Sequence, residues 1–148
     1  MNITSMLLSS KPLTILLIDD DDGDAKAIQR AFHKAKVANH LLRAVDGIEA
    51  FDMLRGTNGV DKISPPYILL VDLNMPRMNG IQFIQALRED KALSNSIAFI
   101  LTTSKRQEDT MAAYSFNVAG YINKATAGQD FLKLVNLIDS YWCIVEMP

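Results

Sequence analysis

Five short apolar runs, separated by longer amphipathic stretches, are the feature that most limits how this chain can fold. Each run is short and apolar enough to be a strand buried on both faces, as the strands of a parallel sheet are. Helices are then needed on both sides of that sheet. The alternation therefore predicts an α/β domain with strands at residues 14–19, 40–44, 67–72, 98–102 and 120–123.

The stretches between these runs have the residue spacing of surface helices. Helices are expected at residues 23–35, 47–55, 80–89, 106–116 and 128–145. In the first of them, apolar residues recur at helical intervals and should face the core, namely Ala27, Ile28, Ala31, Phe32 and Ala35. Residues 56–66 combine glycine, asparagine and proline and are expected to form a loop.

The last expected helix is more apolar than one buried face requires. Its main apolar face consists of Phe131, Val135, Ile138 and Trp142, and leucines widen it further. One interpretation is a helix packed on the sheet with the tail of the chain folded back. The alternative is a surface for a partner or for a second copy of the chain, because surplus apolar surface commonly marks an interface.

Length and charge narrow the domain organisation and the partners. The 148 residues suffice for one core, so we expect an extension at residues 1–12 and a single domain over 13–148. With 15 basic and 17 acidic residues, no direct nucleic-acid or membrane partner is expected. A cytoplasmic location is expected because the sequence shows no signal-peptide pattern, no membrane-spanning run and only one cysteine, Cys143.

Polar side chains collect where four of the five expected strands end. Asp19 and Asp20 follow the first strand, and Asp72 ends the third. Thr102 ends the fourth strand, and Lys124 follows the fifth. Open parallel sheets bind ligands outside the carboxyl ends of their strands, so these groups are expected in one crevice. Taken singly, each also has an ordinary explanation as a turn former, a helix cap or a solvated charge.

The stretch TILLIDDDDGD, residues 14–24, places four consecutive aspartates at one strand end. Unit charges about 5 Å apart repel by roughly 3 kcal/mol at an effective dielectric near 20, so the cluster needs a cation, a proton or water. Such a cluster suits Mg²⁺, which takes one or two carboxylates, water and a phosphate oxygen. Asp22 is expected to cap the first helix, and Asp21 is left without a role.

The remaining groups of the crevice suit a phosphoryl group. Lys124 would bring a positive charge to its oxygens, and Thr102 would donate a hydrogen bond to one of them. A carboxylate can also accept a phosphoryl group as a nucleophile. These residues therefore predict a phosphoryl group held beside Asp72 or bonded to it.

Four motifs in this order, ILLIDDD, ILLVDLNMPRMNG, FILTTS and GYINK, make the chain resemble the receiver domain of two-component response regulators. The resemblance spans residues 13–142, and DLNMPRMNG is its most specific motif. It implies a doubly wound, flavodoxin-like receiver fold with five parallel strands in the order 2-1-3-4-5. It also implies a switch that catalyses only its own phosphorylation and dephosphorylation, so a conventional enzyme is not expected.

The resemblance implies roles for the acidic residues and for one neighbour. Asp72 would be phosphorylated by a partner histidine kinase. Mg²⁺ would be bound by Asp72 itself, directly by Asp20 and through water by Asp19. The backbone carbonyl of Asn74 would complete the metal site.

Three further residues would carry the response to phosphorylation. By resemblance, Lys124 would contact the phosphoryl oxygens, and Thr102 would be the switch hydroxyl drawn toward them. Tyr121 matches the aromatic residue that turns inward when that hydroxyl moves. The output would be contact with a downstream protein whose identity the residues do not reveal.

Two residues depart from the usual receiver pattern. Ala125 stands where most receivers have a proline in a cis peptide, and a cis bond to a non-proline costs about 2.5–4 kcal/mol. The peptide after Lys124 is therefore expected to be trans and its loop displaced. Thr103 stands where a smaller residue is usual and is expected to narrow access to Asp72.

A narrower resemblance concerns the kind of receiver. The long 56–66 loop, the alanine after Lys124 and the ending LIDSYWCIVEMP resemble single-domain receivers paired with phytochrome-type histidine kinases. In that group, the surplus apolar face of the last helix would favour a homodimer.

Other site classes fit the residues less well. A haloacid-dehalogenase-type phosphohydrolase, which also depends on a metal, would need a second aspartate where this chain has Asn74. An EF-hand loop would place Ile18 at its first ligand position, and a flavin site would need hydroxyls instead of carboxylates. His33 and His40 fall outside the crevice and are expected to be structural or exposed. A receiver-like adaptor that binds without phosphorylation stays as the alternative.

Overall fold

The computed structural model describes residues 13–37, 39–75, 77–103 and 116–133. Within them, a five-stranded parallel sheet has the strand order β2-β1-β3-β4-β5, which confirms the order expected from the resemblance. The strands are β1 (Thr14–Ile18), β2 (His40–Ala44), β3 (Tyr67–Asp72), β4 (Ile97–Thr102) and β5 (Gly120–Asn123). All five expected strands are present, although β1 ends one residue earlier and β4 begins one residue earlier than expected.

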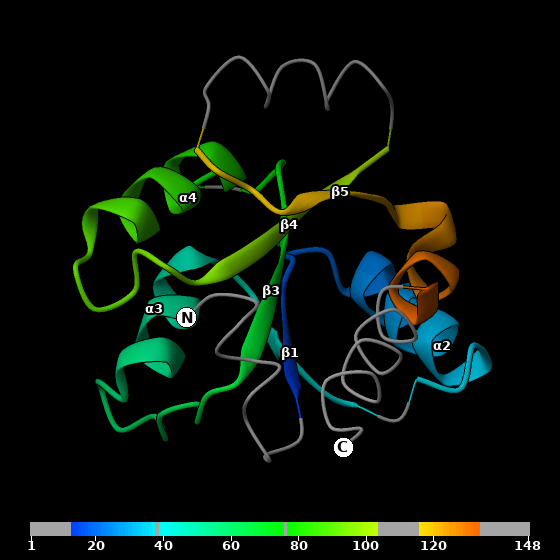
Figure 1. Ribbon diagram of the computed structural model, residues 1–148, viewed down its shortest axis with the longest axis horizontal. Coiled ribbons are helices and arrows are strands. Elements are labelled where there is room, and N and C mark those ends of the chain that lie inside the picture. The colour runs from blue at the N-terminus through cyan, green and yellow to red at the C-terminus, as the bar shows by residue number, and fades with distance from the viewer. Residues whose placement is uncertain (1–12, 38, 76, 104–115, 134–148) are drawn as a thin grey trace, which may run out of the picture.

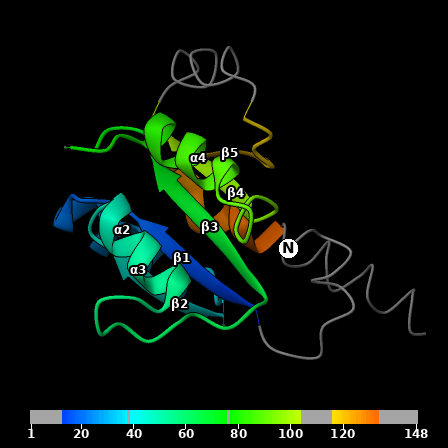
Figure 2. The same ribbon diagram turned by 90° about the vertical axis from the view of Figure 1, so that its left-hand side faces the viewer.

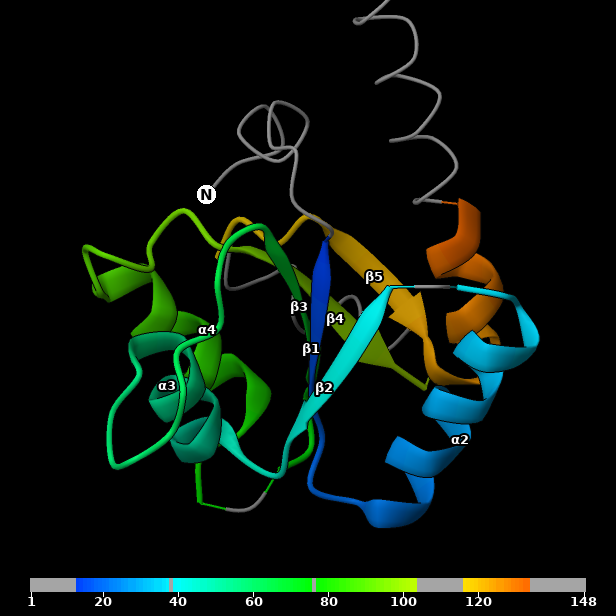
Figure 3. The ribbon, with the colours of Figure 1, turned by 90° about the horizontal axis from the view of Figure 1, so that it is seen from below.

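Helices cover both faces of the sheet (Figure 1). On one face lie α2 (Asp22–Lys34) and a helical segment over residues 127–133, which follows the short 3₁₀ turn η1 (Lys124–Thr126). On the other face lie α3 (Gly47–Arg55) and α4 (Gly80–Glu89), seen in front of the sheet in Figure 2. Seen from below, in Figure 3, the sheet stands between these two pairs. The fold is therefore the doubly wound α/β architecture.

Alternation along each strand divides the apolar side chains between two cores. On β1, Ile15 and Leu17 join the cluster under α2, whereas Leu16 and Ile18 join the cluster under α3 and α4. All six residues of β3 are buried. Burial on both faces explains why the strands read as continuous apolar runs in the sequence.

The register of the strands aligns their carboxyl ends. Ile18 of β1 pairs with Val71 of β3, so the residues that follow, Asp19 and Asp72, come side by side at the same edge. At that edge Asp72 pairs with Leu101 of β4, and the next residue of β4 pairs with Asn123 of β5. The residues expected in one crevice therefore leave the sheet at one edge.

The start of α2 corrects two sequence-based expectations. The N-cap is Asp21, whose side chain accepts a hydrogen bond from the Asp24 N–H at 2.8 Å, and Asp22 is the first helical residue. The buried stripe of α2 begins at Ala25 and continues with Ile28 and Phe32, while Ala27 is exposed. Four identical residues in a row leave the position of the cap open in the sequence.

The C-terminal part of the chain is described only in part. Helical structure after β5 begins with η1 and continues from Ala127, one residue before the expected start. Phe131 is fully buried and stacks on Phe32 of α2 with ring centroids 5.2 Å apart, which confirms packing on the sheet for this residue. Phe116, the last residue of the helix expected at 106–116, is not helical. The rest of that helix, the extension at 1–12 and the apolar residues beyond 133 lie outside the described residues.

Two smaller expectations concern histidine exposure and membrane spans. His33 and His40 are both exposed and lie away from the carboxyl edge of the sheet, as expected. In the described ranges, every helix is too short or too polar to cross a lipid bilayer.

Candidate functional site

Three carboxylates converge at the carboxyl edge of the sheet. Asp19 and Asp72 are buried, Asp20 is exposed, and one oxygen from each of them lies within 4.8 Å of the others. The strand register explains the meeting of Asp19 and Asp72, and Asp20 is the next residue of the chain. The structure thus brings together the three acidic residues that the sequence predicted in one crevice.

Lys124 completes this group from the neighbouring strand end. It is the first residue of η1, and its Nζ lies 3.2 Å from Asp19 Oδ2 and 3.2 Å from Asp72 Oδ1. A third carboxylate is closer, because Nζ donates a hydrogen bond to Asp24 Oδ2 at 2.7 Å. Burial alone would lower the pKa of Lys124, but the hydrogen bond to Asp24 and the charges of Asp72 and Asp19 raise it. Lys124 is therefore a permanent positive charge of the site.

Asp72 has a pKa raised to about 6. Burial is the main cause, and the negative charge of Asp19 adds to it. Lys124 and a backbone hydrogen bond from Asn74, with a nitrogen–oxygen distance of 3.4 Å, act in the opposite direction and are outweighed. Three carboxylates and one lysine meet at this edge, so the site has a deficit of positive charge.

Two buried oxygens of the site accept or donate no hydrogen bond among the described residues. They are Asp19 Oδ2, which has only its ion-pair contact with Lys124, and Thr102 Oγ1 at the end of β4. The other Asp19 oxygen accepts a hydrogen bond from the Asp21 N–H at 3.0 Å. Buried polar atoms without partners are rare, and a bound ion or ligand is one way to supply the missing partner. A hard divalent cation fits the carboxylates, and a phosphoryl oxygen fits the hydroxyl.

Arg43 binds the aspartate-rich segment between β1 and α2, and the sequence did not predict this role. From β2, its Nε and Nη2 donate hydrogen bonds to the Asp19 backbone carbonyl at 3.1 and 3.0 Å, and its Nη1 binds Asp22 Oδ1 at 2.7 Å. The hydrogen bond and charge of Arg43 lower the pKa of Asp22. Asp22 is therefore an ion-pair partner and not the expected cap. The sequence signal was an arginine directly after two leucines, inside the expected strand HLLRA.

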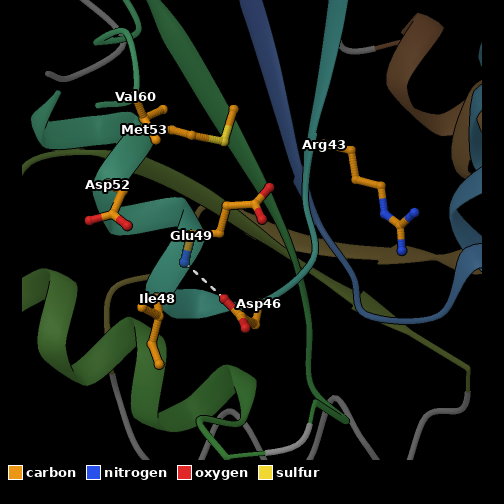
Figure 4. Close-up of a pocket in the computed structure, with 7 residues that line it drawn as sticks. All are labelled: Arg43, Asp46, Ile48, Glu49, Asp52, Met53 and Val60. Atoms are coloured by element: carbon orange, nitrogen blue, oxygen red, sulfur yellow. Dashed lines mark hydrogen bonds between the residues drawn. The ribbon is translucent and has the colours of Figure 1, made fainter. Parts of the chain in front are cut away.

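A hollow of about 460 Å³ next to α3 is separate from the carboxylate group. Its lining residues are Arg43, Asp46, Ile48, Glu49, Asp52, Met53 and Val60. In Figure 4, Arg43 extends away from the other lining side chains, toward α2. The carboxylate of Asp46 is occupied as the N-cap of α3, accepting from the Glu49 N–H at 2.8 Å. The crevice with the three carboxylates is thus the better candidate site.

The loop after Asp72 turns sharply back to α4. Gly80 has no room for a side chain, because a Cβ there would lie 2.5 Å from the Asp72 carbonyl oxygen. Asn79 caps α4 and shares a reciprocal capping box with Gln82. The Asn-Gly pair of the motif DLNMPRMNG is therefore explained by the turn: asparagine caps α4, and glycine fits where a side chain would not. Asn74, at the start of this loop, is exposed.

Two further predicted residues belong to the neighbouring strands: Tyr121 lies within β5, and Thr103 directly follows β4. Tyr121 on β5 is half-buried against the core cluster under α3 and α4, and Thr103 is exposed. The cis peptide of the described residues is Pro65–Pro66, so the Lys124–Ala125 peptide is trans as expected. Ala125 donates its N–H to the Asn123 side chain at 2.8 Å, which a proline could not do.

Fold and site together define a doubly wound α/β protein whose acidic crevice lies where strand order reverses. The response regulator receiver domain family matches residues 15–136, and the chain belongs to this family of two-component signalling. The expectation from the four motifs is thereby confirmed.

Relatives with these features include phytochrome-associated response regulators. Response regulator Rcp1 of Synechocystis sp. is 28% identical over 134 residues, covering 90% of this chain and 91% of Rcp1. The solved bacteriophytochrome response regulator AtBRR has a TM-score of 0.77 at 26% identity, covering 85% of this chain and 91% of AtBRR. The phosphorylated cyanobacterial phytochrome response regulator RcpA has a TM-score of 0.68 at 26% identity, covering 93% of this chain and 98% of RcpA. The Mn²⁺-bound form of Rcp1 has a TM-score of 0.64 at 26% identity, covering 89% of this chain and 94% of that one.

Proposed function

We propose that this protein is a cytoplasmic signalling switch that a histidine kinase activates by phosphorylating Asp72. The observation that carries the proposal is the position of Asp72, whose buried carboxylate lies 3.2 Å from Lys124 and beside Asp19 and Asp20. A buried carboxylate beside two other acidic groups, with a lysine and an unpaired hydroxyl at the same edge of the sheet, suits both attack on phosphorus and binding of the product. The phosphorylated state of the relative RcpA supports this reaction class.

The transfer step conserves atoms and charge. An Asp72 carboxylate oxygen attacks the phosphorus of a phosphohistidine on the kinase, the new O–P bond forms, and the P–N bond breaks. The imidazole leaves as neutral histidine after taking up a proton. Water later attacks the acyl phosphate and releases inorganic phosphate, which returns Asp72 to a carboxylate. Above the pKa of about 6, Asp72 is ionised and can act as the nucleophile.

Mg²⁺ is the cofactor that we propose for this reaction. The residues that would hold it are Asp19, Asp20, Asp72 and, through its carbonyl, Asn74. When bound, Mg²⁺ neutralises charge on the phosphoryl oxygens and the carboxylates. The support is the buried Asp19 Oδ2 without a hydrogen-bond donor, the deficit of positive charge around Asp72 and the Mn²⁺-bound form of the relative Rcp1.

Lys124 and Thr102 would bind the phosphoryl oxygens, and Tyr121 would carry the change to the surface. Thr102 Oγ1 is buried without a partner and is thus available to a new acceptor at the crevice. Its movement would bias a pre-existing equilibrium that Tyr121 reports to a downstream protein. The similarity to AtBRR and RcpA supports a phytochrome-type kinase as the partner. A homodimer through the last helix stays a prediction, since its outer residues lie outside the described part of the chain.

Phosphorylation with acetyl phosphate and Mg²⁺, followed by intact mass, tests the proposal. The wild type should gain one phosphoryl group, and Asp72→Asn should gain none. Asp90→Asn is the matched control, because Asp90 is bound to Arg55 by an exposed ion pair outside the crevice. Modification of Asp72→Asn to the same extent would show another acceptor. Absence of modification with small donors and kinases alike would favour the adaptor that binds without phosphorylation.

A further inference from the structure

Asp24 makes the shortest contact of Lys124, although neither the metal site nor the acceptor includes it. Asp24 Oδ2 lies 2.7 Å from Nζ, against 3.2 Å for both Asp19 and Asp72. Asp24 belongs to the first turn of α2, one hundred residues away from Lys124 in the sequence. About half of the Asp24 side chain is exposed, while that of Lys124 is 14% exposed. The pair therefore joins the start of α2 to the end of β5 over the crevice.

The two elements that carry this pair are held tightly against each other. Gly128, four residues after Lys124, packs so closely on α2 that a Cβ there would overlap the carbonyl of Ala31. Phe131 stacks on Phe32 one turn further along. Asp24 itself is fixed at its backbone, because its N–H is bound by the Asp21 cap. Packing thus fixes the two backbone segments that bring Asp24 and Lys124 within reach of each other.

The proposed reaction would withdraw the other two partners of Lys124. A cation would take the Asp19 carboxylate, and phosphorylation would convert Asp72 into an acyl phosphate, so that the new phosphoryl oxygens replace the Asp72 carboxylate as a partner of Lys124. Asp24 is the one carboxylate of the three that neither event uses. A free lysine side chain carries about 2 kcal/mol of rotamer entropy, so a lasting anchor matters for where the ammonium lies.

We infer that Asp24 is a positioning residue, which holds Lys124 at the crevice through the whole phosphorylation cycle. This inference rests on the proposed function, because it concerns the placement of the group that contacts the phosphoryl oxygens. Asp24 binds neither the phosphoryl group nor the metal; it acts through Lys124. Removing the Asp24 carboxylate should therefore slow phosphorylation in a protein that has Lys124, and should have no effect in a protein that lacks it.

A double-mutant cycle tests the inference. Phosphorylation rates are measured with acetyl phosphate at saturating Mg²⁺ for the wild type, Asp24→Ala, Lys124→Met and the double variant, each shown to be folded by circular dichroism. Asp24→Ala should be slower than the wild type by about fivefold, the effect of a half-exposed ion pair worth about 1 kcal/mol. In the Lys124→Met background the same substitution should change nothing. Asp24→Glu, which restores the charge, should recover most of the rate.

The outcomes separate the two proposals. An equal fold-loss from Asp24→Ala in both backgrounds would show that Asp24 acts through helix α2 or the general field, and would overturn the positioning role. So would a rate for Asp24→Ala equal to or above that of the wild type, or a failure of Asp24→Glu to recover it. If the wild type itself takes up no phosphoryl group, the proposed function has failed. The positioning role is then withdrawn together with it.

Discussion

Two partly buried cations, Lys124 and Arg88, show how differently this fold uses positive charge. Lys124 lies among three carboxylates at the carboxyl edge of the sheet. Arg88, near the end of α4, binds uncharged groups instead. Among the described residues all of its hydrogen-bond acceptors are backbone carbonyl oxygens, at 2.7 to 3.0 Å, from Ser94, Ser96, Phe116 and Asn117.

The difference in partners appears in the two pKa values. Burial lowers the pKa of Arg88, with no carboxylate to offset it, whereas nearby carboxylates raise the pKa of Lys124 in spite of its burial. Carbonyl oxygens of the backbone have fixed places, so Arg88 ties the loop before β4 to the chain leading into β5. Carboxylates can exchange a lysine for another cation. Arg88 therefore acts as a structural clamp between two loops, whereas a bound cation can replace Lys124 as the partner of the carboxylates.

Replacing Arg88 by methionine should produce the largest loss of stability. The substitution keeps most of the aliphatic stem but removes the donors to four carbonyl oxygens, and each buried acceptor left without a donor costs about 1–3 kcal/mol. Because part of this site can admit water, we expect a total loss of about 3 kcal/mol in the free energy of unfolding, measured by urea denaturation. Arg88→Lys should recover part of it, since an ammonium can still donate to some of the carbonyls. A loss below about 1 kcal/mol for Arg88→Met would contradict the clamp.

Asp72→Asn should give the next largest effect, with the opposite sign. The pKa of Asp72 is about 6 in the folded protein and 3.8 as its ordinary value, so the folded state binds more protons between these values. Stability is therefore lost as pH rises from 3.8 to about 6, and the uncharged amide avoids this loss. Without Mg²⁺, we expect Asp72→Asn to be more stable than the wild type by about 2–3 kcal/mol at pH 7.5 and by about half of that at pH 5.

Asp90→Asn is the control for this pH dependence. The hydrogen bond from Arg55 lowers the pKa of Asp90, so its ionised form is the one that the fold favours. The control should be slightly destabilised at neutral pH, and its deficit should vanish as pH falls below the ordinary value. If both variants were stabilised alike, a general effect of net charge would replace the local explanation for Asp72.

The sequence predicted the strands and the main crevice residues because both depend on local patterns. Runs buried on two faces are continuously apolar, and the register of parallel strands brings their ends to one edge. The sequence could not choose between Asp21 and Asp22 as the cap, since neighbouring aspartates are equivalent until the helix frame is set. It also could not show the partners of Arg43, which are the Asp19 carbonyl and the Asp22 carboxylate, or those of Arg88, which are backbone carbonyls of two separate loops. Asp24 was missed for the same reason, because its contact with Lys124 depends on how closely two helices pack.

The smallest expected effect is on Mg²⁺ binding, which should depend on Lys124 but not on Arg88. In the wild type, Mg²⁺ at ten times its dissociation constant should raise the free energy of unfolding by about 1.4 kcal/mol. Lys124 competes with a cation for Asp19 and Asp72, so Lys124→Met should bind Mg²⁺ several-fold more tightly, a gain of about 1 kcal/mol. Arg88→Lys should leave the affinity for Mg²⁺ unchanged, because Arg88 binds none of the carboxylates.

Asp20→Asn tests the metal site itself and should remove most of the stabilisation by Mg²⁺. Titrations followed by thermal melting measure all four proteins, and a melting temperature of the wild type that ignores Mg²⁺ would refute the metal site.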